Sequence, residues 1–113
     1  MKQIKKNYKI SVILPNFNHG HYISKAIDNL LLQKQDVCEI IIIDDASKDN
    51  SIEIIKEKIG KTKLFKFLVN KVNIGTIRTQ NKALKIAKGQ FIYLAAADDY
   101  ILPNFFQKSI SIF

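Results

Sequence analysis

Short apolar runs alternate along the chain with stretches in which apolar residues recur every three or four positions. We predict that the runs are strands, because β-branched and aromatic residues dominate them and turn-forming residues bound them. The predicted strands are residues 9–14, 39–43, 65–69 and 91–95. The stretches with helical spacing are residues 22–31, 52–59 and 76–88, and a further helix is predicted to begin at Pro103. Residues 15–20 and 44–50 have the composition of loops.

The second apolar run indicates how the strands are arranged. It contains four successive isoleucines at positions 40–43, so both faces of this strand must be covered, as in a parallel sheet between two layers of helices. Repeated strand-helix-strand units with right-handed crossovers then give a doubly wound α/β fold, and we predict the strand order 3-2-1-4. In this order the first and fourth strands are neighbours where the winding reverses, and ligands bind beyond the carboxyl ends of such strands.

Length and composition are those of one globular domain, since the chain has 113 residues, of which 47% are hydrophobic and 25% charged. We assign residues 1–8 to a basic N-terminal tail and residues 9–113 to the domain. The apolar run at residues 10–14 is too short for a signal peptide or a membrane span, so we expect the chain in the cytoplasm. A lone cysteine, Cys38, offers neither an internal disulfide nor a zinc site, and we expect it to be a small buried residue.

The formal net charge is +8, which would attract nucleic acid, anionic lipid or acidic ligands. The lysines are scattered through the tail, the middle of the chain and the third predicted helix, which favours solvated surfaces and helix ends. The next interpretation is a weak contact with an anionic membrane surface, which would place the chain at the inner face of the membrane. Nucleic acid binding is disfavoured, because the aromatic residues lie in apolar runs and do not interleave with the basic ones.

Two pairs of adjacent aspartates follow two of the predicted strands: Asp44 and Asp45 after the second, and Asp98 and Asp99 after the fourth. Carboxylates that meet at one edge of a sheet repel each other unless a cation or hydrogen-bond donors compensate their charge. A divalent cation, Mn²⁺ or Mg²⁺, would suit such a cleft and would screen a bound diphosphate. The alternative is that both pairs are ordinary turn residues, and that Asp44 and Asp45 open a turn and a helix cap.

Several motifs follow one another in a specific order and spacing. They are residues 11–18 (SVILPNFN), residues 39–49 (EIIIIDDASKD), residues 73–75 (NIG) with Asn81 and Gly89, and the Asp98-Asp99 pair before Leu102-Pro103. Together they resemble the inverting family 2 glycosyltransferases of the GT-A fold. The resemblance extends over nearly the whole chain from Lys9 onward, and it implies a truncated nucleotide-diphospho-sugar transferase fold, reduced to its donor-binding half.

The resemblance also implies roles for individual residues. Those implied to bind the nucleotide sugar are Pro15, Asn16, Phe17, Asn18, Asp44, Asp45, Gly75, Arg78, Asn81 and Asp98. Phe17 would pack near the base, Asp44 would hydrogen-bond the base, and Asp98 would lie near the ribose. Asp99 together with Asp98 would ligate the divalent cation, which orients the sugar and stabilises charge on the departing nucleoside diphosphate. For Asn81 the alternative is a polar helix residue that caps a loop.

The chain departs from the pattern of the family at several positions. Ala96 stands where many relatives carry a further aspartate, so the carboxylate cluster is thinner. Gln80 stands where arginine often precedes the asparagine, and Arg78 lies on a different face of the helix, as a candidate phosphate contact. We expect His19 and His21 to be solvated or capping residues.

The expected function is transfer of a sugar from a nucleotide-diphosphate sugar, with a UDP-sugar as the expected donor, to an acceptor hydroxyl. The family commonly serves polysaccharide assembly, and its members supply the general base from beyond the donor half. Because this chain ends at Phe113, we expect a donor-binding half without its acceptor half. The alternative is a catalytically silent nucleotide-sugar binding module. We also expect self-association through the edge of the fourth strand and the last predicted helix.

Overall fold

The computed structural model describes residues 9–98, in which strands and helices alternate. The strands are β1 (Ile10–Asn16), β2 (Val37–Asp44), β3 (Phe65–Val69) and β4 (Phe91–Leu94). The helices are α1 (Gly20–Leu31), α2 (Ser51–Ile59) and α3 (Thr76–Ile86), and a short 3₁₀ helix covers Lys34–Asp36. All strand pairs are parallel, and the order is β3-β2-β1-β4. The predicted α/β fold and strand order are confirmed.

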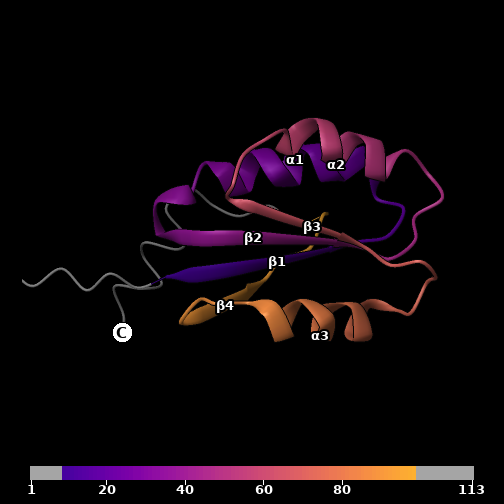
Figure 1. Ribbon diagram of the computed structural model, residues 1–113. Helices are drawn as coiled ribbons and strands as arrows, with labels where there is room; N and C mark the ends of the chain where they lie inside the picture. The colour runs from indigo at the N-terminus through magenta and orange to yellow at the C-terminus, as the bar shows by residue number, and fades with distance from the viewer. Residues whose placement is uncertain (1–8, 99–113) are drawn as a thin grey trace, which may run out of the picture.

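The sheet lies between two helical layers, with α1 and α2 on one face and α3 on the other (Figure 1). The isoleucine run of β2 serves both layers. Ile40 and Ile42 belong to the core beneath α1 and α2, whereas Ile41 and Ile43 pack with Ala83 beneath α3. Because side chains alternate across a strand, a strand buried on both faces needs apolar residues at every position, and this run supplies them.

The two helical layers differ in what they bury. α1 directs Ile23, Ala26, Ile27 and Leu30 toward the sheet, with the spacing of a helix that has one apolar stripe. α3 buries two residues, Thr79 and Ala83, of which Ala83 is the apolar one. The layer formed by α3 therefore covers the central strands without filling the space at their carboxyl ends.

Strand β1 continues through Pro15 and Asn16, although the sequence predicted loop there, and both residues pair with β2. Successive residues of a strand direct their backbone groups to alternate neighbours. Asn16 faces β2, since its carbonyl accepts the Asp45 N–H at 2.8 Å, so Pro15 faces the side of β4. The pairing with β4 has already ended at Ile13, and the missing N–H of Pro15 therefore removes no hydrogen bond from the sheet.

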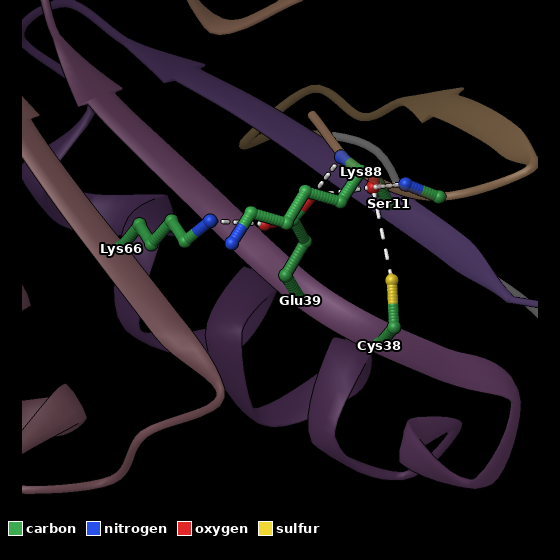
Figure 2. A network of polar contacts seen from close by, with 6 residues as sticks. Ser11, Cys38, Glu39, Lys66 and Lys88 are labelled. Atoms are coloured by element: carbon green, nitrogen blue, oxygen red, sulfur yellow. Dashed lines mark hydrogen bonds and ion pairs between the residues drawn. The ribbon is translucent and has the colours of Figure 1, made fainter. Parts of the chain in front are cut away.

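At the amino edge of the sheet, Glu39 is the centre of a polar network (Figure 2). Its Oε2 atom accepts hydrogen bonds from Ser11 Oγ and from the Lys88 backbone N–H, both at 2.6 Å. Its Oε1 atom accepts one from Lys66 Nζ at 2.7 Å. Gly89 completes the network by donating its N–H to Ser11 Oγ, and a Cβ atom at Gly89 would lie 2.5 Å from the Ser11 nitrogen. The network thus joins the α3–β4 connection to three strands.

Some expectations are corrected at the ends of elements. α3 ends at Ile86 and not at residue 88, because Ala87 already has an extended backbone. Cys38 lies at the amino end of β2 and is exposed, not buried. The predicted tail, Asp99 and the helix predicted from Pro103 lie outside the described residues, and self-association stays a prediction. Within residues 9–98, no helix has the length and apolar character needed to cross a bilayer.

Candidate functional site

At the carboxyl edge of the sheet, a cavity of about 320 Å³ lies between the end of β1, helix α3 and the residues that follow β4. The residues that line it are Pro15, Asn16, Phe17, His19, Asp45, Thr76, Thr79, Gln80, Ala95, Ala96 and Ala97. β1 and β4 are the neighbouring strands at which the winding reverses, which is where ligands bind in open α/β sheets. Of the residues predicted from the sequence to bind a nucleotide sugar, Pro15, Asn16, Phe17 and Asp45 line this cavity.

Asp44 lies behind the cavity wall and does not line it. Its side chain is 0% exposed. Its Oδ1 atom accepts hydrogen bonds from Asn16 Nδ2 at 2.9 Å and from Ser47 Oγ at 2.7 Å, and its Oδ2 atom accepts the Ser47 N–H at 2.8 Å. The geometry is that of a turn residue that holds Asn16 and Ser47 in place, and it does not bring Asp44 to the position expected for a contact with a nucleotide base.

Asp45 connects the cavity to the loop before α3. Its Oδ1 atom accepts hydrogen bonds from the Ile74 N–H at 2.8 Å and from Asn70 Nδ2 at 3.0 Å, and its Oδ2 atom accepts the Gly75 N–H at 2.8 Å. Burial raises the pKa of Asp45, but these hydrogen bonds outweigh it and hold the pKa below its ordinary value. Asp45 is therefore a charged residue that anchors the first turn of α3 beside the cavity.

Two polar atoms of the cavity wall lack hydrogen-bond partners. Within residues 9–98, Asn16 Oδ1 and His19 Nδ1 are buried and have no partner. Asn16 is only 2% exposed, and its orientation follows from its partner, because the amide nitrogen must face the Asp44 carboxylate. A buried polar atom without a partner costs about 1–3 kcal/mol, so such atoms at a cavity are typical of a site that a ligand or water completes.

The loop after β1 is held by side chains that follow β2. Asn18 has a left-handed backbone (φ 54°), and its Oδ1 atom accepts the Lys48 N–H at 2.8 Å. Asp49 accepts the Gly20 N–H at 2.9 Å and so fixes the start of α1. Phe17, which precedes Asn18 in this loop, lines the cavity and is 42% exposed. Asn18 thus supports the site through the loop and is not itself part of the cavity wall.

The residues of α3 that line the cavity are not the ones that the sequence predicted. Arg78 and Asn81 are exposed and do not line it, whereas Thr76, Thr79 and Gln80 do. These three precede the buried Ala83 by seven, four and three positions, which places them on the same side of the helix. Gly75, which was also predicted, precedes the helix (φ 91°) and donates its N–H to Asp45.

The three described aspartates, Asp44, Asp45 and Asp98, do not line one cleft together, although the sequence predicted that they would. The oxygens of Asp44 and Asp45 accept hydrogen bonds within the fold, as described above. Asp98 is exposed and lines a second cavity of about 440 Å³ beside α1, which adjoins the first one at Ala97. Asp99 lies outside the described residues.

This arrangement does not complete a metal site from the described residues alone. Residues 9–98 contain no group of three or more His, Cys, Asp or Glu side chains that could hold a metal ion. A divalent cation needs several oxygen ligands, and Asp98 is the one predicted ligand in this part of the chain. The metal roles of Asp98 and Asp99 stay predictions.

Comparison with known proteins agrees with the fold. Residues 11–113 match the model of glycosyl transferase family 2, and the chain belongs to that family. A relative from Mycoplasma pneumoniae, the uncharacterized glycosyltransferase MG025 homolog, is 36% identical over 104 residues, which cover 89% of this chain and 35% of the relative. The poly(ribitol-phosphate) beta-glucosyltransferase of Bacillus spizizenii is 39% identical over 99 residues, which cover 82% of this chain and 15% of that enzyme.

Solved structures show the same architecture. S. aureus TarS 1-349 in complex with UDP-GlcNAc superposes with a TM-score of 0.82 at 31% identity, over 91% of this chain and 30% of TarS 1-349. The mannosyltransferase PcManGT from Pyrobaculum calidifontis, in complex with GDP-Man and Mn²⁺, gives a TM-score of 0.81 at 20% identity, over 89% of this chain and 31% of PcManGT. The GT-A fold is confirmed. The chain spans about a third of the length of the curated relatives that it matches first, between 35% and 41%.

Four polar residues of the cavity wall were not predicted as site residues: His19, Thr76, Thr79 and Gln80. For the three on α3, a signal exists in the sequence, because Ala83 is the small apolar residue that must face the sheet, and counting back by helical spacing reaches them. For His19 we find no comparable signal, since its place in the wall depends on the path of the loop that Asn18 supports.

Proposed function

We propose that the chain is the nucleotide-sugar-binding part of an inverting glycosyltransferase, which moves a sugar from a nucleotide-diphosphate sugar to an acceptor hydroxyl. The observation that carries the proposal is the cavity at the carboxyl edge, whose wall contains the unpaired atoms Asn16 Oδ1 and His19 Nδ1. Membership of glycosyl transferase family 2 supports it. The 31% identity to a protein that is solved in complex with UDP-GlcNAc favours a UDP-sugar as the donor.

In this proposal the nucleotide occupies the 320 Å³ cavity. Its base packs against Phe17, and an N–H or O–H group of the ligand donates to Asn16 Oδ1, which removes the cost of an unpaired acceptor. Asp44 is a positioning residue, because its hydrogen bond to Nδ2 sets the direction of the Asn16 amide. Asp45 and the polar residues of α3 form the opposite wall.

The proposed cofactor is a divalent cation, Mn²⁺ or Mg²⁺, held by Asp98 and Asp99. When bound, such an ion screens the charge of the diphosphate and stabilises the nucleoside diphosphate as it leaves. Two proteins of the same fold, 20% and 21% identical to this chain, have been solved in complex with Mn²⁺. None of the described residues is assigned as the general base. The proposed process is polysaccharide assembly, and the proposed location is the cytoplasm. The Bacillus spizizenii relative, which is named as a poly(ribitol-phosphate) beta-glucosyltransferase, supports the assembly of a sugar-bearing polymer.

Calorimetric titration of the full chain with UDP-GlcNAc in the presence of MnCl₂ tests the binding step. We expect Phe17→Ala to weaken binding roughly tenfold, because an aromatic contact with the base is lost. Leu68→Ala, which truncates a partly exposed apolar side chain on β3, is the matched control and should leave binding unchanged. If the folded chain gives no binding heat with UDP-GlcNAc or UDP, with or without the metal, the proposed function is wrong.

The alternative, a catalytically silent binding module, is considered because the chain spans only part of its relatives. Release of UDP from UDP-GlcNAc separates the two functions. Release of UDP by this chain, in the presence or absence of an acceptor, would reject the silent module. Release of UDP in the presence of an acceptor by a longer polypeptide that includes this chain would reject it as well.

A further inference from the structure

The charged residues are divided unequally between the two helix layers. α3 contains three basic residues, Arg78, Lys82 and Lys85, and no aspartate or glutamate. The layer of α1 and α2 carries both signs, as in the ion pair between Lys58 Nζ and Asp28 Oδ1 at 2.7 Å. Of the helices in residues 9–98, α3 is the one on its face of the sheet, and its charged residues are all positive (Figure 1).

The outer side of α3 also exposes aliphatic side chains. Ile77 is 74% exposed and Leu84 is 40% exposed, and their separation of seven residues places them on one side of the helix. Arg78 and Lys85 are likewise exposed and seven residues apart, on the adjoining side. A helix that carries apolar side chains beside a row of cations is typical of an interfacial helix that lies on an anionic bilayer.

We propose that the outer face of α3 is a docking surface for an anionic lipid bilayer. The cations supply attraction to acidic headgroups, worth about 1 kcal/mol for each lysine near the membrane surface. Ile77 and Leu84 supply the shallow apolar contact. Nucleic acid is a poorer match for this face, because α3 has no aromatic residue on which a base could stack.

This docking surface is separate from the nucleotide cavity. Ile77, Leu84 and Lys85 do not line the cavity, whereas Thr76, Thr79 and Gln80 of the same helix do. Docking through the first set of residues would therefore leave the residues of the cavity wall in place. The proposal does not depend on the proposed function, since membrane binding is measured without nucleotide.

Sedimentation of the full chain with lipid vesicles tests the proposal. We expect binding to vesicles of phosphatidylglycerol and phosphatidylcholine, and no binding to vesicles of phosphatidylcholine alone. The double variant Arg78→Gln/Lys85→Gln should reduce the partition coefficient about 30-fold, which corresponds to two basic residues at the membrane surface. The matched control is Lys25→Gln/Lys56→Gln, which removes the same charge from α1 and α2 and should reduce it less than about twofold.

A third variant, Ile77→Ser, measures the apolar contact, and we expect it to reduce the partition coefficient about fivefold. Urea unfolding of each variant checks that the substituted surface residues leave the fold intact. Equal weakening by the two double variants would overturn the proposal, as would equal binding to phosphatidylcholine vesicles. If soluble polyphosphate displaces the chain from vesicles and Ile77→Ser has no effect, the face binds a soluble polyanion and the proposal is wrong.

Discussion

Both edges of the sheet contain buried carboxylates, but they differ in whether the neighbouring polar groups all have hydrogen-bond partners. At the amino edge, Glu39 accepts hydrogen bonds from Ser11, Lys66 and the Lys88 N–H, and no buried side-chain atom of these residues lacks a partner within residues 9–98. At the carboxyl edge, Asp44 and Asp45 are satisfied as well. Their neighbours Asn16 and His19, however, each keep one buried atom without a partner beside a cavity.

The difference shows which observation indicates a ligand site. A buried carboxylate with a complete set of donors stabilises the fold and has no need of a ligand. Where a cavity wall contains buried polar atoms without hydrogen-bond partners, a ligand that supplies the matching donors or acceptors binds more favourably. The comparison therefore predicts that changes at the amino edge alter stability alone, and that changes at the carboxyl edge alter stability and nucleotide binding together.

The largest expected effect is the loss of the Glu39 carboxylate. Glu39→Ala leaves the Ser11 hydroxyl and the Lys88 N–H without an acceptor, and we expect the free energy of unfolding to fall by about 3 kcal/mol. Urea unfolding measures this. Nucleotide affinity of the folded chain should be unchanged. Glu39→Gln, which keeps an acceptor oxygen, is the milder control, and a loss of nucleotide affinity in that folded variant would break the comparison.

The next effect is expected at Asp45. Asp45→Ala leaves the N–H groups of Ile74 and Gly75 without an acceptor, and we expect a loss of about 2 kcal/mol in the free energy of unfolding. We also expect weaker nucleotide binding, because the first turn of α3 loses its anchor beside the cavity. Asp49→Ala is the matched control, since Asp49 holds Gly20 and Ser51 but does not line the cavity. Equal effects of both variants on nucleotide affinity would contradict this prediction.

Acid should destabilise both edges. Burial raises the pKa of Glu39, but hydrogen bonds from Lys66, Ser11 and the Lys88 N–H outweigh it and lower the pKa from its ordinary value of 4.5. For Asp45 the balance also lowers the pKa, from 3.8. Below these ordinary values the unfolded chain takes up a proton before the folded chain does, so the stability that both groups contribute at neutral pH is lost as the pH falls.

This pH dependence is measured as the urea midpoint between about pH 7 and about pH 3. Glu39→Gln should flatten the upper part of the decline, which begins near the ordinary pKa of a glutamate. Asp45→Asn should flatten the lower part. A wild-type midpoint that stays constant over this range would show that neither carboxylate is more acidic in the folded chain.

The smallest effects are expected at two residues with left-handed backbones. Ala46, between Asp45 and Ser47, has φ 59°, which costs a residue with a Cβ atom about 1 kcal/mol, so Ala46→Gly should stabilise the chain by up to that amount. Gly60, at the end of α2, has φ 51° and ψ −127°, a combination that favours glycine, so Gly60→Ala should destabilise the chain by about 1 kcal/mol or more. Thermal unfolding measures both, and opposite signs are expected. A destabilising Ala46→Gly would show that the Asp44 turn needs the stiffer residue.

Much of the fold could be predicted because its signals are local. The bounds of β3 agree with the predicted residues 65–69, and the isoleucines at 40–43 imply a strand covered on both faces. The end of β1 could not be predicted in this way. Pro15 is a turn signal by composition, and it is accepted into the strand because the pairing with β4 has already ended there.

The site was predicted less completely than the fold. The sequence indicated the carboxyl edge of the sheet, where the cavity lies, and four residues of the cavity wall, Pro15, Asn16, Phe17 and Asp45. The sequence did not indicate that Asp45 lines the cavity whereas Asp44 is buried behind it. The two residues are adjacent and of the same type, so no local pattern distinguishes them. The sequence also selected Arg78 and Asn81 on α3, whose side chains are exposed.

The sequence by itself determined the class of fold, the strand order and the family, because apolar periodicity and the order of motifs are properties of the chain alone. The tertiary structure decided which polar groups are used within the fold and which remain for a ligand. That division depends on donors and acceptors from segments far apart in the chain, as when Asn16 meets Asp44, and Glu39 meets Lys88. Such partners become neighbours when the sheet is formed, and no local pattern in the sequence records which of them will pair.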